Sequence, residues 1–112
     1  MAEKKRRPPV PVPPVIHDGV RYEAPLTGGE VDEKQDGGIV AAIEEATGRL
    51  LWTVVVYPQV YDPQMEDDKQ DVYIKAMTLE KGEKTLKIVN ESGQTFRLTL
   101  SDQSVKRVRS LF

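Results

Sequence analysis

Apolar and polar residues alternate along much of the chain between residues 71 and 109, as expected for strands that bury one face. Segments 84–90 and 95–100 alternate most regularly, and they place on one face Leu86, Ile88, Phe96, Leu98 and Leu100. Residues 71–80 and 105–109 are also predicted to be strands, and simple alternation puts Ile74 and Met77 on opposite faces of the first. Turn-forming residues separate these segments at intervals of about ten residues, which indicates an antiparallel meander.

Two hairpins are predicted in the first half of the chain. Asp18-Gly19 lies between the strand candidates 15–17 and 20–23, and this dipeptide suits the positive φ angles of a type I′ turn. Residues 39–44 and 50–57 form the second pair, with Gly48 in a turn that needs positive φ. A helix over 39–46 is the alternative, because the segment is rich in alanine and glutamate, but Gly48 and the β-branched run behind it favour a strand. Both faces of 50–57 are largely apolar, which predicts a central strand covered on both sides.

Together these segments predict a mostly β protein with little helix. We expect a single-domain antiparallel meander of six to seven strands, arranged as a small sandwich or barrel, over residues 15–112. Residues 1–14 are expected to form a disordered, basic, proline-rich tail, since five prolines favour polyproline II and remove amide donors. Lys5, Pro8 and Pro11 match a loose pattern of peptides that dock into aromatic grooves, although such matches arise often by chance in proline-rich tails.

The hairpin around Gly48 also carries a resemblance. Residues 42–52 read Ala-Ile-Glu-Glu-Ala-Thr-Gly-Arg-Leu-Leu-Trp, which resembles the blade repeat of quinoprotein-type (PQQ-like) β-propellers, with Glu44 where the repeat usually has aspartate. The motif occurs once, and a propeller needs at least four blades of about 40 residues. The resemblance therefore implies a hairpin anchored by Thr47, Gly48 and a docked Trp52, without quinone binding. More widely, the chain resembles small uncharacterised bacterial β proteins, a likeness that implies no activity.

The amino-acid composition excludes several classes of functional site. The 112 residues carry a net charge of −2 and contain no cysteine, which excludes disulfides, thiolate metal sites and thiol catalysis. Four of the 16 basic residues lie in residues 3–7, so the rest of the chain is acidic, and nucleic acid is not expected to bind beyond the basic tail. No apolar run approaches the ~18 residues of a membrane span, and no signal peptide is visible. We therefore expect a cytoplasmic protein.

The sequence shows no recognisable arrangement of catalytic residues. We therefore predict no catalytic residues, no cofactor and no metal ligands. His17 is the single histidine, and no serine lies in a nucleophile elbow. Carboxylates crowd the loops 24–38 and 62–71, but their spacing does not match an EF-hand. A small ligand- or ion-binding barrel that uses these carboxylates, with enzymatic activity as one option, is the alternative function.

The preferred interpretation is a non-enzymatic β module that contacts another protein, at an open sheet edge or through the 58–71 loop. Aromatic side chains dominate interface hot spots when they are exposed, although these aromatic residues are more simply core or rim residues. The candidate contact residues are Tyr57, Tyr61, Asp62, Glu66 and Asp68. The sequence predicts neither an oligomeric state nor a specific partner.

Overall fold

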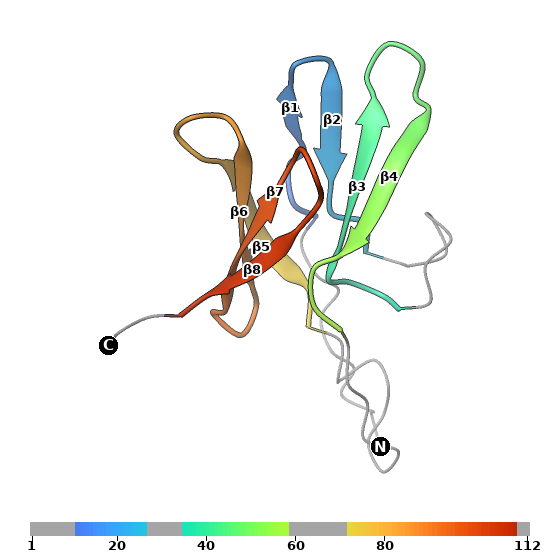
Figure 1. Ribbon diagram of the computed structural model, residues 1–112. Helices are drawn as coiled ribbons and strands as arrows, with labels where there is room; N and C mark the ends of the chain where they lie inside the picture. Colours follow the sequence, from blue (N-terminus) through green and yellow to red (C-terminus); the bar gives the residue numbers. More distant parts are fainter. Residues whose placement is uncertain (1–10, 27–34, 59–71, 110–112) are drawn as a thin grey trace, which may run out of the picture.

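The protein is a sandwich of two antiparallel sheets (Figure 1). The computed structural model describes residues 11–26, 35–58 and 72–109, in which every regular element is a strand. The first sheet has the order β1-β2-β3-β4, and the second the order β5-β6-β7-β8. The strands are β1 (Val15–His17), β2 (Val20–Glu23), β3 (Ile39–Glu44), β4 (Leu50–Val55), β5 (Ile74–Leu79), β6 (Thr85–Asn90), β7 (Thr95–Thr99) and β8 (Val105–Val108).

The predicted all-β meander and its sandwich form are confirmed. Each strand pairs with its sequence neighbour, and the connection between β4 and β5 leads from one sheet to the other. β4 does not pair with β5, and β1 does not pair with β8, so the two sheets do not close and the barrel alternative is wrong. The described residues contain eight strands, which is more than the six to seven expected. Residues 1–10 of the expected tail lie outside the described residues; of the rest of that tail, Val12 packs against the core.

Turn chemistry accounts for the first two hairpins. Asp18 and Gly19 have φ of 52° and 77°, the two positive angles that a type I′ turn requires. Gly48 has φ of 75° in the β3–β4 turn, where its amide donates to the Glu44 carbonyl. The helix alternative for 39–46 is wrong, since β3 pairs with strands on both sides.

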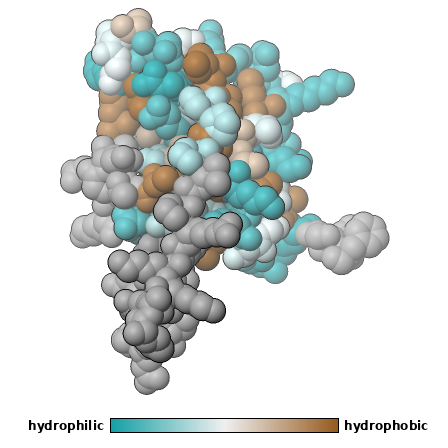
Figure 2. Space-filling view, turned by 180° about the vertical axis from the view of Figure 1, so that it is seen from behind, coloured by the Kyte–Doolittle hydropathy of each residue, from teal (hydrophilic) through white to brown (hydrophobic). Residues whose placement is uncertain are grey.

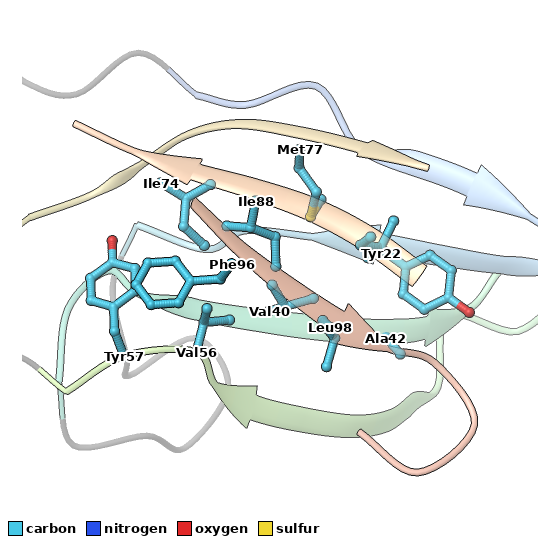
Figure 3. Close-up of a cluster of buried hydrophobic side chains, with 11 residues drawn as sticks. Tyr22, Val40, Ala42, Val56, Tyr57, Ile74, Met77, Ile88, Phe96 and Leu98 are labelled. Carbon is cyan, nitrogen blue, oxygen red and sulfur yellow. The ribbon is translucent and has the colours of Figure 1, made fainter. Parts of the chain in front are cut away.

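The core lies between the two sheets, which both contribute to it (Figure 3). Val40 and Ala42 of β3 face this core, as do Leu86 and Ile88 of β6 and the pair Phe96 and Leu98 of β7. The regular alternation of segments 84–90 and 95–100 therefore identified the inward residues correctly. Burying each large aliphatic side chain stabilises the fold by about 1.5–3 kcal/mol.

The predicted faces of β5 were wrong. Ile74 and Met77 are both buried, although simple alternation puts them on opposite faces. The register between β5 and β6 shifts between Ile74 and Ala76, so a β-bulge adds one residue and turns both side chains inward. Lys75 and Ala76 are consequently exposed.

β4 occupies a different place from the one expected. It is an edge strand of its sheet, and its Leu50, Leu51 and Val55 are exposed. The strand that is covered on both faces is β3, whose residues from Ile39 to Ala42 are all buried. A largely apolar strand is compatible with either position, and strand order along the sheet decides between them.

Candidate functional site

The apolar edge strand β4 is the most unusual feature of the surface. Leu50, Leu51 and Val55 are 45%, 39% and 42% exposed, and they lie within six residues that include no charge and no proline. Apolar side chains gather along the margin of the molecule where β4 lies in Figure 2. Exposed, uncharged and apolar edges are templates for pairing with another strand.

The other three sheet edges carry recognised protection against pairing. β1 has only three residues and follows Pro13 and Pro14. β5 has a bulge and the exposed Lys75, and β8 exposes both Lys106 and Arg107. Short strands, prolines, bulges and charges each discourage edge-to-edge association. β4 has a register shift opposite Ala42 and Ile43, but none of the charged or proline devices.

The backbone groups of Val55 in β4 point away from β3. The Val56 amide donates to the Gly38 carbonyl at 2.8 Å, which directs the backbone of Val56 toward β3. Hydrogen-bonding direction alternates along an antiparallel strand. The amide and carbonyl of Val55, which lies opposite Ile39, therefore point away from β3. Val55 thus presents a donor, an acceptor and an exposed apolar side chain at the same edge.

The residues named as structural anchors lie at the start of β4. The Thr47 hydroxyl donates to Glu44 Oε1 and accepts from the Arg49 amide at 3.2 Å, which ties the turn together. Trp52 is half-buried, and its ring centroid lies 5.9 Å from that of Tyr22 at an interplanar angle of 45°. Trp52 therefore holds the inner face of β4 against the core while the outer face remains in solvent.

Tyr57, the first candidate contact residue, is a core residue. It is 8% exposed, its ring stacks on Phe96 with centroids 5.2 Å apart, and its hydroxyl donates to the Val72 carbonyl (Figure 3). Burial raises the pKa of its phenol, the nearby Glu91 charge raises it further, and a hydrogen bond with Asn90 partly opposes both effects. Tyr57 thus connects the end of the first sheet to the second. The other candidate contacts lie outside the described residues: Tyr61, Asp62, Glu66 and Asp68.

The carboxylate loops fall largely outside the described residues, so ion binding there stays a prediction. The part of the chain that the structure describes contains no group of three or more histidine, cysteine or carboxylate residues able to hold a metal ion. His17 lies 4.0 Å from Glu83, which joins the β1–β2 hairpin to the β5–β6 turn across the two sheets.

Two kinds of residue escaped the sequence reasoning. The apolar positions of β4 were expected to be buried, and their hydropathy carried no signal of exposure. Asn90 was assigned no role, yet it is fully buried, and its Oδ1 accepts from the amides of Ser92 at 3.1 Å and Gln94 at 2.9 Å. Its place directly before Glu91, Ser92 and Gly93, between two predicted strands, was the available signal, because asparagine side chains often bond the backbone two residues on.

No protein-family model matches this chain, and neither does any curated protein. In the described ranges there is also no helix long and apolar enough to cross a membrane.

Proposed function

We propose that this protein is a non-enzymatic interaction module that binds an extended segment of another protein along β4. The single observation that carries the proposal is that β4 is the only strand, among the four edges in the described residues, without a charge, a proline or extreme shortness to prevent pairing. Edge strands usually carry such devices against association, and an apolar edge without charges or prolines is a site for strand addition.

The chemistry of recognition follows from the geometry of β4. An added strand would form backbone hydrogen bonds with groups such as those of Val55, and these bonds are independent of the partner's sequence. Selectivity would come from alternate side chains packing on Leu51 and Val55, which favours a partner strand with apolar residues at every second position. Trp52 and Val54, held against the core, keep the strand extended and rigid before binding.

Strand addition is tested by placing charges on β4. We expect the double variant Leu51→Lys/Val55→Lys to lose binding of apolar alternating peptides selected from a displayed random-peptide library, because lysine on an edge opposes pairing. Both side chains are exposed, so stability should change by less than about 1 kcal/mol. Peptide binding is measured by fluorescence anisotropy, and amide hydrogen exchange reports whether β4 becomes protected in the complex.

Ile16→Lys is the matched control, since Ile16 is 60% exposed on β1, the opposite edge of the same sheet. This variant should bind the selected peptides like the unchanged protein. Selected peptides that bind all three proteins equally, or that protect amides elsewhere than β4, would contradict the proposal. If sedimentation shows a dimer that the β4 variant dissociates, the added strand comes from a second copy of the chain.

A further inference from the structure

A hollow lined by basic side chains lies on the second sheet, away from β4. It encloses about 620 Å³ beside the β6–β7 turn and the end of β8. Its lining includes four cationic side chains and no carboxylate. The cations are Lys87, Arg97, Arg107 and Arg109. We call this feature the cationic hollow. Its volume falls within the range of about 300–1,000 Å³ that is typical of ligand sites.

The strand register brings like charges together beside the cationic hollow. Lys87 of β6 lies directly opposite Arg97 of β7, and Arg97 lies directly opposite Lys106 of β8. Side chains at directly opposed positions are about 5 Å apart at Cβ, and like charges there destabilise a sheet. All three residues are exposed. The repulsion within this row, which Glu80 offsets in part, would be reduced further by a bound anion.

Little within the described residues neutralises these cations. Arg97 Nε donates to Glu80 Oε1 at 2.8 Å, and hydrogen bonds from Thr85 and Arg97 lower the pKa of Glu80. No carboxylate in the described ranges lies within ion-pair distance of Lys87, Arg107 or Arg109. Among the described residues, Arg107 and Arg109 therefore have no carboxylate partner, whereas Lys87 lies near enough to Glu80 to help lower the pKa of that carboxyl.

Charge is separated between the two sheets on a larger scale. Residues 72–109 contain eight basic and four acidic side chains, a balance of +4. The described residues of the first sheet and its connections, 11–26 and 35–58, contain two basic and five acidic side chains, a balance of −3. The overall charge of −2 conceals this separation. The molecule would therefore orient its second sheet toward an anionic partner.

The lining of the hollow favours carboxylates on a polypeptide over nucleic acid. Three of its cations are arginines, whose planar guanidinium groups bind carboxylates in pairs of hydrogen bonds. The lining includes no aromatic ring on which a base would stack. A long nucleic acid would also meet the acidic first sheet, whereas a short acidic segment would contact the hollow alone.

The wall of the hollow formed by the β6–β7 turn is preorganised. Ser92, Gly93 and Gln94 line it, and the amides of Ser92 and Gln94 are bound by the buried Asn90 side chain. Gly93 has φ of 80°, and its amide donates to the Asn90 carbonyl. A fixed wall lowers the entropic cost of ordering a site when a ligand binds.

We propose that the cationic hollow binds an acidic, extended segment of a partner protein through Lys87, Arg97, Arg107 and Arg109. The site lies on the second sheet and β4 lies on the first, so the proposal does not depend on strand addition at β4. The two surfaces would allow the module to contact an apolar strand and an acidic segment separately.

The test uses a fluorescein-labelled peptide in which glutamate and serine alternate, with fluorescence anisotropy as the readout. We expect saturable binding at low salt that weakens as salt is added. Arg107→Glu/Arg109→Glu should weaken it by about tenfold or more, since two attractive contacts become repulsive. Arg107→Gln/Arg109→Gln should show a smaller loss. Both residues are exposed at the end of β8, and thermal unfolding verifies that the variants remain folded.

Lys81→Glu/Lys84→Glu is the control with the same change in net charge. Both lysines are exposed in the β5–β6 turn, at the opposite end of the second sheet from the β6–β7 turn (Figure 1). This variant should bind the peptide within about twofold of the unchanged protein, because neither lysine lines the cationic hollow. Equal losses in both charge-reversed variants, or no binding of the peptide, would overturn the proposal. Tighter binding of duplex or single-stranded DNA of matched length would overturn it as well.

Discussion

The position of Tyr57 in the core could not be predicted from its local sequence. It ends an apolar strand and precedes Pro58, a setting that equally suits a surface aromatic residue. In the structure it lies between the sheets, stacked on Phe96 and bonded to the Val72 carbonyl (Figure 3). Asn90 is comparable, since its polar side chain is buried because the turn amides satisfy it. Tyr57 is buried by partners that are distant in the sequence, whereas the partners of Asn90 lie two and four residues away.

Tyr57→Phe tests this role through the dependence of stability on pH. Loss of the hydroxyl should cost about 1 kcal/mol near neutral pH, the net value of a typical hydrogen bond. Because the folded-state pKa of Tyr57 is raised above the unfolded value of about 10, the phenol's contribution is complete below about pH 10 and is lost as the pH rises further. Urea unfolding across this range should show a smaller alkaline loss for the variant. Parallel curves for the two proteins would contradict the role.

At the scale of elements, edges and bulges decide which residues meet solvent. β3 and β4 have similar apolar composition, but β3 lies inside its sheet and β4 at its margin. One extra residue in β5 places Ile74 and Met77 on the same face, although alternation alone assigns them to opposite faces. The connection into β3 is equally specific, since Gly38 packs against the backbone of Tyr57 as the chain enters the strand.

Substitution of two glycines separates turn strain from close packing. Gly19 and Gly38 both have positive φ, but a Cβ at Gly19 would meet open space, whereas one at Gly38 would lie 2.9 Å from the Tyr57 carbonyl oxygen. Gly19→Ala should therefore cost about 1 kcal/mol through backbone strain alone. Gly38→Ala should cost about 3 kcal/mol, because the neighbouring backbone must also shift. Urea denaturation of the two variants measures the difference, and equal losses would mean that the close approach at Gly38 is relieved at little cost.

At the scale of the whole molecule, two sheets of opposite charge share one core. The buried cluster takes Tyr22, Val40 and Ala42 from the first sheet and, among others, Leu86 and Leu98 from the second. Within the described residues, each sheet buries these side chains against the other sheet. The sheets should therefore depend on each other for stability, although each presents its own surface to partners.

This dependence predicts a single cooperative unfolding transition. Leu98→Ala in the second sheet should cost about 3 kcal/mol, because the fully buried side chain leaves a cavity. Val40→Ala in the first sheet should cost about 2 kcal/mol for the same reason. Native-state hydrogen exchange should show that each variant lowers protection in both sheets to a similar extent. Loss of protection confined to the mutated sheet would show that the sheets unfold independently.

The strands, the turns and most inward residues could be predicted from the sequence alone, because these features depend on contacts between near neighbours. Alternation identified Leu86, Ile88, Phe96 and Leu98, and Asp18-Gly19 specified its hairpin through backbone sterics. The candidate site was predicted less well. An open sheet edge was anticipated as a mode of contact, but β4 was assigned to the interior and the cationic hollow was hidden by the overall acidic charge.

Three features depend on long-range pairing: which strand lies at an edge, where a bulge reverses a face, and which cations lie close together. Lys87, Arg97 and Lys106 are about ten residues apart along the chain, and they become neighbours only through the register of three strands. Hydropathy and charge are properties of single residues, whereas exposure and electrostatic potential are sums over all residues nearby in space. Long-range pairing sets those sums, and for that reason the sequence pattern predicted the fold further than it predicted the sites.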